Sequence, residues 1–226
     1  MSKIPENRAP AKTFHELQKL SVIDSVGYFK NLADILEKTK VTWMQKNLLM
    51  KKITLNTAID LLISSYLVKL LPPATQKLFV VGNGGSAAIA MHTLVDYANA
   101  GGLRTHDLFG PPLSSCMAND YGYKNGFAKP IEMFANEGDI LFAISSSGKS
   151  KNILNACNSA LAKKCQVITF SGFSPYNPLR KLGHLNFYVP STHYGFVECP
   201  HQIILHCILD LFVRSNVYEK TIELLG

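Results

Sequence analysis

Small polar residues gather in two short segments, each of which directly follows an apolar run. Residues 82–86 read GNGGS, and residues 145–150 read SSSGKS. Glycine lets the backbone approach an anion closely, and free N–H groups at the start of a helix favour negative charge. Serine hydroxyls donate to phosphate oxygens. A tight turn with a serine cap would explain either segment alone. Two such segments in one chain favour a phosphorylated ligand.

Histidines and carboxylates recur at helical spacing in two other places. His92 and Asp96 lie four residues apart and would share one face of a helix. Glu198 and His206 lie eight residues apart, just over two turns. Two imidazoles and two carboxylates suit Zn²⁺ or another divalent cation. By spacing alone, a simple hydrogen-bonded pair of histidine and aspartate is the commoner arrangement, so both interpretations stay open here.

The elements that must position these residues alternate along the chain. Short apolar runs predict strands, and segments with apolar residues at helical spacing follow them. The predicted strands cover residues 77–81, 139–144, 165–170 and 185–189, and the predicted helices cover residues 87–98, 151–164 and about 198–213. This order predicts an α/β fold, a three-layer sandwich whose central parallel sheet is doubly wound by helices. In such sheets ligands bind beyond the carboxyl ends of the strands, where both polar segments fall.

The N-terminal third of the chain differs from the rest. Residues 1–15 are rich in Pro, Ala and Lys and predict a flexible arm. Residues 16–70 carry apolar side chains at helical spacing and predict N-terminal helices that pack on the sheet or on partner subunits. Residues 71–226 would form the sheet-containing domain, so we expect a single structural domain overall.

Composition limits the classes of function. The chain has 226 residues, 47% of them hydrophobic, enough for a full core without disulfides. No apolar run reaches 18 residues and the N-terminus has no hydrophobic leader, so we expect neither a membrane span nor secretion. The five cysteines form no CxxC pair, which is typical of reduced thiols in the cytoplasm.

The net charge of +7 is dispersed, and we expect an anionic small molecule as ligand, with no nucleic acid. Neither polar segment is a Walker A or a dinucleotide fingerprint, so no nucleotide cofactor is expected.

Further motifs in a fixed order resemble the SIS (sugar isomerase) domain family, and within it the phosphoheptose isomerases. The order is GNGGS, a helical MH, ANDYG at residues 118–122, EGD at 137–139, ISSSGKS, the strand VITF, and a C-terminal helix with histidine. The resemblance covers roughly residues 25–215 and implies a homotetramer. It also implies an aldose–ketose isomerase that converts sedoheptulose 7-phosphate to D-glycero-D-manno-heptose 7-phosphate, for lipopolysaccharide or capsule heptose.

Carried over position by position, the resemblance implies three groups of site residues. Substrate contacts fall on Asn83, Gly84, Gly85, Ser86, Asn119, Asp120, Ser145, Ser146, Ser147, Ser150 and Glu198. Metal ligands, for Zn²⁺ or another divalent ion, fall on His92, Asp96, Glu198 and His206. Asp96 would be the catalytic base and His206 the acid, and Glu198 could take over as base.

Two positions depart from the family pattern, which usually has glutamate at Asp96 and glutamine at Glu198. Aspartate is one methylene shorter, about 1.5 Å of lost reach, and a misplacement of about 1 Å can cost a hundredfold in rate. Two other functions therefore stay open. One is a phosphosugar sensor without turnover, and the other is a binder of the bacterial replication initiator, as in a related SIS group. The two histidines and two carboxylates favour the enzyme.

Overall fold

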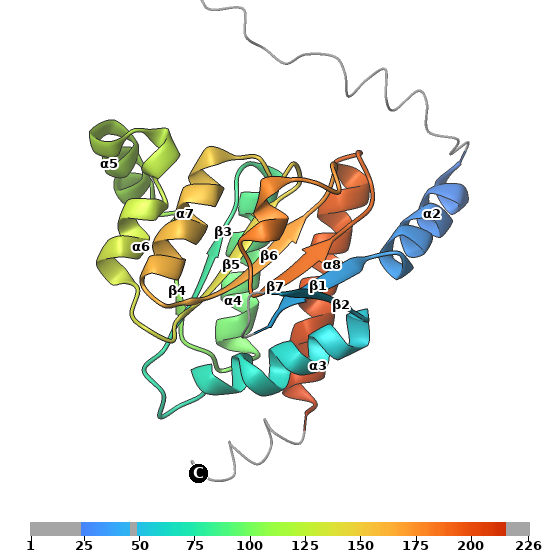
Figure 1. Ribbon diagram of the computed structural model, residues 1–226, viewed down its shortest axis with the longest axis horizontal. Helices are drawn as coiled ribbons and strands as arrows, with labels where there is room; N and C mark the ends of the chain where they lie inside the picture. Colours follow the sequence, from blue (N-terminus) through green and yellow to red (C-terminus); the bar gives the residue numbers. More distant parts are fainter. Residues whose placement is uncertain (1–23, 46–48, 216–226) are drawn as a thin grey trace, which may run out of the picture.

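The structure is a computed structural model that describes residues 24–45 and 49–215. A seven-stranded sheet in the order β2-β1-β7-β6-β5-β3-β4 forms its centre (Figure 1). Five strands are parallel: β3 (Leu78–Val81), β4 (Thr105–His106), β5 (Ile140–Ser145), β6 (Gln166–Ser171) and β7 (Leu185–Tyr188). The antiparallel strands β1 (Lys40–Met44) and β2 (Met50–Ile53) extend the sheet beyond β7. The predicted α/β architecture is confirmed.

Alternating side chains of the strands build a core on each face of the sheet. Leu78 and Val80 of β3 belong to one apolar cluster, and Phe79 and Val81 belong to the other. This period of two is what a fully buried strand requires. The first cluster includes side chains of α3 (Leu55–Ser65), α4 (Gly85–Asn99) and α8 (Gly195–Val213). The second includes side chains of α6 (Ala128–Phe134) and α7 (Lys151–Ala162).

The remaining helices lie at the margins of the fold. In Figure 1, α2 (Ser25–Glu37) projects away from the sheet, and α5 (Pro111–Tyr121) lies at the opposite side beside α6. The short 3₁₀ helices are η1 (Leu67–Leu70), η2 (Tyr123–Asn125) and η3 (Pro178–Lys181). The predicted arm at residues 1–15 lies outside the described residues. The motif at residues 118–122 lies at the end of α5, where Gly122 (φ 75°) terminates the helix.

The prediction of helices throughout residues 16–70 is wrong for residues 40–44 and 50–53. Those residues form a hairpin, and β1 pairs with β7 so that Val41 lies opposite Phe187. Val41 is thereby buried in the core. The segment KVTWM carries β-branched and aromatic side chains, which favour a strand once a partner strand is available. Spacing of apolar residues within the segment could not reveal that partner.

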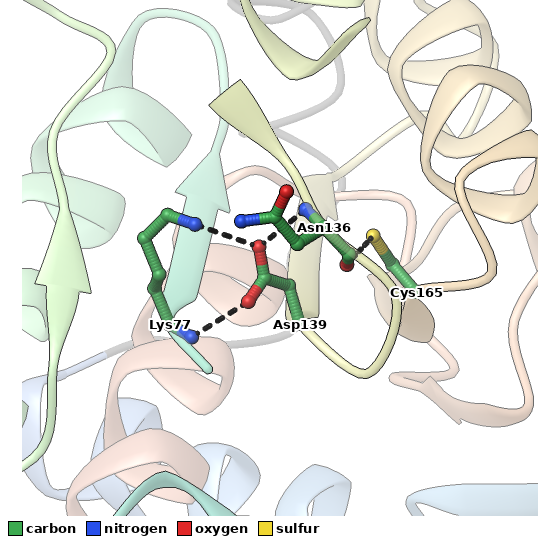
Figure 2. A network of polar contacts seen from close by, with 4 residues as sticks. All are labelled: Lys77, Asn136, Asp139 and Cys165. Atoms are coloured by element: carbon green, nitrogen blue, oxygen red, sulfur yellow. Dashed lines mark hydrogen bonds and ion pairs between the residues drawn. The ribbon is translucent and has the colours of Figure 1, made fainter. Parts of the chain in front are cut away.

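Asp139 anchors the amino-terminal ends of two central strands (Figure 2). Its buried carboxylate accepts hydrogen bonds from the backbone N–H groups of Lys77 and Asn136, both at 2.8 Å. The Lys77 ammonium lies 3.0 Å from the same carboxylate. These contacts join the residues just before β3 and β5, at the sheet edge opposite the polar segments that end those strands.

Helix α8 is long and apolar enough, by length and composition, to cross a membrane. Half of its most apolar window is buried inside the fold, however, and residues such as Ile204 and Ile208 belong to the core. Packing against the sheet and α4 therefore accounts for its apolar composition.

Candidate active site

The segment after β5 forms a small polar cavity at the carboxyl edge of the sheet, which we call the serine pocket. Its volume is about 110 Å³, and its lining consists of Asn83, Ser86, Ile144, Ser145, Ser146, Ser147, Ser150, Tyr194 and Glu198. Sites that enclose a whole small molecule usually exceed about 300 Å³. The serine pocket is therefore of a size for a phosphate group, with the remainder of any larger ligand outside it.

Backbone contacts fix the shape of the serine pocket. Gly148 adopts a left-handed conformation (φ 62°), and its N–H donates to the Ser145 hydroxyl at 3.2 Å. The N–H of Gly172, just after β6, donates to the Ser146 carbonyl at 3.0 Å. A left-handed turn of this kind favours glycine. The ends of the adjacent strands β5 and β6 thus hold the serine hydroxyls around one space.

Asn83 is held at the pocket by two residues that the sequence reasoning missed. The amides of Asn83 and Asn152 bond reciprocally, at 2.9 and 2.8 Å, and the Tyr123 hydroxyl donates to Asn83 Oδ1 at 2.9 Å. Asn152 lies in the first turn of α7, directly after the serine segment. This place in the sequence could have identified it as a residue near the pocket. Asn119 and Asp120 lie near the end of α5 and outside the pocket lining.

Three of the four predicted metal ligands come together between α4 and α8. His92 Nε2 lies 2.8 Å from Asp96 Oδ2, and His206 Nδ1 lies 3.6 Å from the same oxygen. One ligand atom from each residue falls within 4.8 Å of the others. A mixed set of imidazole and carboxylate donors suits Zn²⁺ and similar divalent ions. We call these residues the His–Asp–His group.

Glu198 lies in the serine pocket and outside the His–Asp–His group. It precedes His206 by eight residues, roughly 12 Å along the helix axis at 1.5 Å per residue. Its carboxylate accepts a hydrogen bond from the Ser146 hydroxyl at 3.4 Å. It also occupies the space left by the missing side chain of Gly85, where a Cβ would lie 2.4 Å from Oε2.

Burial raises the pKa of the Glu198 carboxyl, and the Ser146 hydrogen bond opposes that effect. A bound phosphate would raise this pKa further, because a nearby anion disfavours a second negative charge.

Comparison with known proteins identifies the family of this chain. Residues 28–172 match the family model of the SIS domain. A phosphoheptose isomerase from Shewanella denitrificans is 32% identical over 153 residues, which are 62% of this chain and 76% of that protein. One from Helicobacter hepaticus is 33% identical over 150 residues, covering 64% and 76%. The solved structure of a phosphoheptose isomerase from Francisella tularensis gives a TM-score of 0.70 at 26% identity, covering 88% of this chain and 99% of that one.

The chain therefore belongs to the SIS-domain family, and within it to the phosphoheptose isomerases. This confirms the resemblance that the sequence motifs indicated. It also agrees with a catalytic protein of the aldose–ketose isomerase class.

Proposed function

We propose that this protein converts sedoheptulose 7-phosphate to D-glycero-D-manno-heptose 7-phosphate at a site between the serine pocket and the His–Asp–His group. One observation carries the proposal: both features lie along the same two packed helices, α4 and α8. They are separated by roughly 12 Å along α8. An extended seven-carbon monophosphate spans about 10 Å from phosphorus to C1, which suits this separation.

The serine pocket binds the phosphate in this proposal. Ser145, Ser146, Ser147 and Ser150 present hydroxyls, and the backbone of Gly84, Gly85 and Ser86 begins α4 at the pocket. N–H groups at a helix start favour an anion. Asn83 and Glu198 contact the ligand next to the phosphate. Asn119 and Asp120 are proposed contacts with the sugar chain.

The His–Asp–His group carries out the proton transfers. Asp96 turns Oδ2 toward both histidines, which leaves Oδ1 for the substrate. Asp96 takes the proton from C1 of the ketose, the electron pair forms the double bond of an enediol, and a proton returns to C2 to give the aldose. His206 moves a proton between the oxygens on C2 and C1. A divalent ion such as Zn²⁺, held by His92, Asp96 and His206, would polarise the sugar carbonyl.

A second role for Glu198 would be that of fourth metal ligand or catalytic base. For either role, its side chain would have to turn out of the serine pocket toward the His–Asp–His group. Its hydrogen bond with Ser146 and its position beside Gly85 support a role in contacting the substrate instead.

Turnover of sedoheptulose 7-phosphate, with and without added Zn²⁺ after chelator treatment, tests the proposal. We expect metal-dependent turnover that Asp96→Asn and His206→Ala each reduce at least a hundredfold, the usual scale for a general acid or base. Asp210→Asn, the same substitution one turn beyond His206 on the exposed side of α8, should leave the rate within twofold. Saturable binding of the sugar phosphate without any turnover would indicate a sensor and would overturn the proposal.

The alternative of a binder of the replication initiator is not favoured, because such an adaptor has no need for a His–Asp–His group. We further propose a cytoplasmic homotetramer that supplies heptose for lipopolysaccharide or capsule and binds neither nucleic acid nor membrane. The five cysteines, all free thiols in the structure, support the cytoplasm. The exposed apolar side chains of Met91 and Val95 on α4 support the assembly.

A further inference from the structure

Tyr194 is a residue of the serine pocket that no motif singled out. It immediately precedes α8, and its carbonyl accepts hydrogen bonds from the N–H groups of Val197 and Glu198, at 3.0 and 2.7 Å. These bonds fix Tyr194 one helical turn from Glu198. About half of the side chain, 49%, remains exposed. Among the described residues, its hydroxyl has no hydrogen-bond partner and is therefore free to bond a ligand.

The ring of Phe173 packs against the ring of Tyr194. The two ring centroids lie 5.0 Å apart with planes at 75°, an edge-to-face contact. Phe173 itself has φ 55°, a left-handed conformation that is rare for a bulky residue. Two hydrogen bonds hold its backbone there: its N–H donates to the Ser191 carbonyl at 2.8 Å, and its carbonyl accepts from the Tyr188 hydroxyl at 3.0 Å.

The segment that carries Phe173 also shapes the serine pocket. The preceding residue, Gly172, donates its N–H to the Ser146 carbonyl at 3.0 Å. One short segment after β6 thus fixes both the serine backbone and the aromatic ring beside it. Unfavourable backbone conformations of this kind cluster at functional sites, where the surroundings enforce them.

We propose that Tyr194 is a substrate-contacting residue, whose hydroxyl donates to an oxygen of the bound phosphosugar, and that Phe173 is the residue that positions it. The inference rests on the proposed function in that the ligand is a phosphosugar. A cavity of about 110 Å³ holds the phosphate group only, so the sugar chain must leave across its rim. Tyr194 is the aromatic side chain in that lining.

Steady-state kinetics of Tyr194→Phe and Tyr194→Ala test the contact. We expect Tyr194→Phe to raise KM for sedoheptulose 7-phosphate about fivefold, the usual effect of one hydrogen bond, and Tyr194→Ala to raise it more than tenfold. In both variants kcat should stay within threefold, because the reacting carbons lie at the far end of the substrate. Tyr176→Phe and Tyr176→Ala are matched controls, since Tyr176 is 86% exposed and outside the pocket lining. A KM within twofold of wild type in both Tyr194 variants would overturn the inference.

Variants of Phe173 test its positioning role. Phe173→Leu should raise KM as the Tyr194 variants do, and Phe173→Tyr, which keeps the ring, should restore it. In a Tyr194→Ala background, Phe173→Leu should add less than twofold to KM, because its effect acts through Tyr194. If Phe173→Leu lowers the melting temperature but leaves KM unchanged, its role is structural only and the positioning inference fails.

Calorimetric binding separates this inference from the proposed function. Sedoheptulose 7-phosphate and inorganic phosphate are titrated into wild type and into Tyr194→Phe. Binding of the sugar phosphate that weakens in Tyr194→Phe, without turnover in wild type, would overturn the proposed function and support the contact. Normal wild-type turnover with equal binding in both proteins would overturn the contact alone. Failure of wild type to bind either compound would overturn both.

Discussion

Among the single residues, His201 shows how burial determines a charge state. It belongs to α8 and is fully buried, with Nε2 3.2 Å from the Ser171 carbonyl oxygen and with Nδ1 unpaired among the described residues. Burial lowers its pKa to about 4 from 6.5. Between these values the unfolded chain takes up a proton that the folded chain does not. Stability is therefore lost as the pH falls from about 6.5 toward 4.

The predicted loss from this one residue is about 2 kcal/mol at pH 5, at 1.36 kcal/mol per unit of pKa difference. Urea unfolding at pH 7.5 and pH 5 measures it in wild type and in His201→Gln, whose amide can still bond the Ser171 carbonyl. The variant should lose about 2 kcal/mol less between the two pH values. An equal loss in both proteins would show that His201 is not the group responsible.

Among single residues, the sequence predicted three side chains that the structure brings together, but it did not predict the residues that contact the serine pocket from distant segments. His92, Asp96 and His206 meet because helical spacing places the first two on one face and α8 packs beside α4. Tyr194 and Asn152 were missed because their importance depends on neighbours that are distant in the chain. Glu198 shares α8 with His206, yet it faces a different space, since the absence of a side chain at Gly85 lets its carboxylate turn toward the serines.

Among the elements, the strands that carry the site were predictable and the hairpin was not. Residues 140–145 are buried on both faces, five of the six are apolar, and the run ends where the polar segment begins. Residues 166–171 are nearly all buried as well, and their Val, Ile and Phe favour a strand. Strand β1 has only five residues, and its pairing with β7 joins positions more than 140 residues apart. Local patterns contain no information about such a pairing.

The contacts of Asp139, which link the residues just before β3 and β5, give a prediction about the free energy of unfolding. Asp139→Ala would leave the N–H groups of Lys77 and Asn136 without their acceptor and the largely buried Lys77 ammonium without its partner (Figure 2). Breaking a buried pair typically costs about 3–5 kcal/mol. We expect a loss of about 3 kcal/mol in urea unfolding, because Lys77 keeps some access to water.

Two variants serve as controls for the Asp139 prediction. Asp139→Asn keeps an oxygen that accepts from one of the two N–H groups and should lose less than Asp139→Ala. Glu137→Ala removes a carboxylate two residues away, whose contact with Lys164 is exposed, and it should leave the unfolding midpoint unchanged. Equal effects of Asp139→Ala and Glu137→Ala would refute a special role for the buried pair.

For the whole molecule, the exposed side of α4 is the face on which the proposed homotetramer would place its subunit contacts. An apolar groove of about 540 Å³ runs along it, lined by Met91, Leu94, Val95, Ala98, Asn99, Thr105 and Asp107. Val95 is 65% exposed there. Scattered apolar residues are ordinary on a surface, but a continuous groove is typical of an interaction site. His92 lies on the same helix, so the proposed homotetramer would bring a second copy close to the His–Asp–His group.

Val95→Lys tests this assembly, because a lysine buried in the groove would carry an unpaired charge away from water. Sedimentation velocity should give a tetramer for wild type and a smaller species for Val95→Lys, with a melting temperature lowered only by the lost subunit contacts. Tyr176→Lys, at a more exposed position outside the groove, should remain tetrameric. Because His92 adjoins the groove, turnover should fall as the tetramer dissociates, and it should recover at protein concentrations that restore the assembly. A tetrameric Val95→Lys protein would place the subunit contacts on another face.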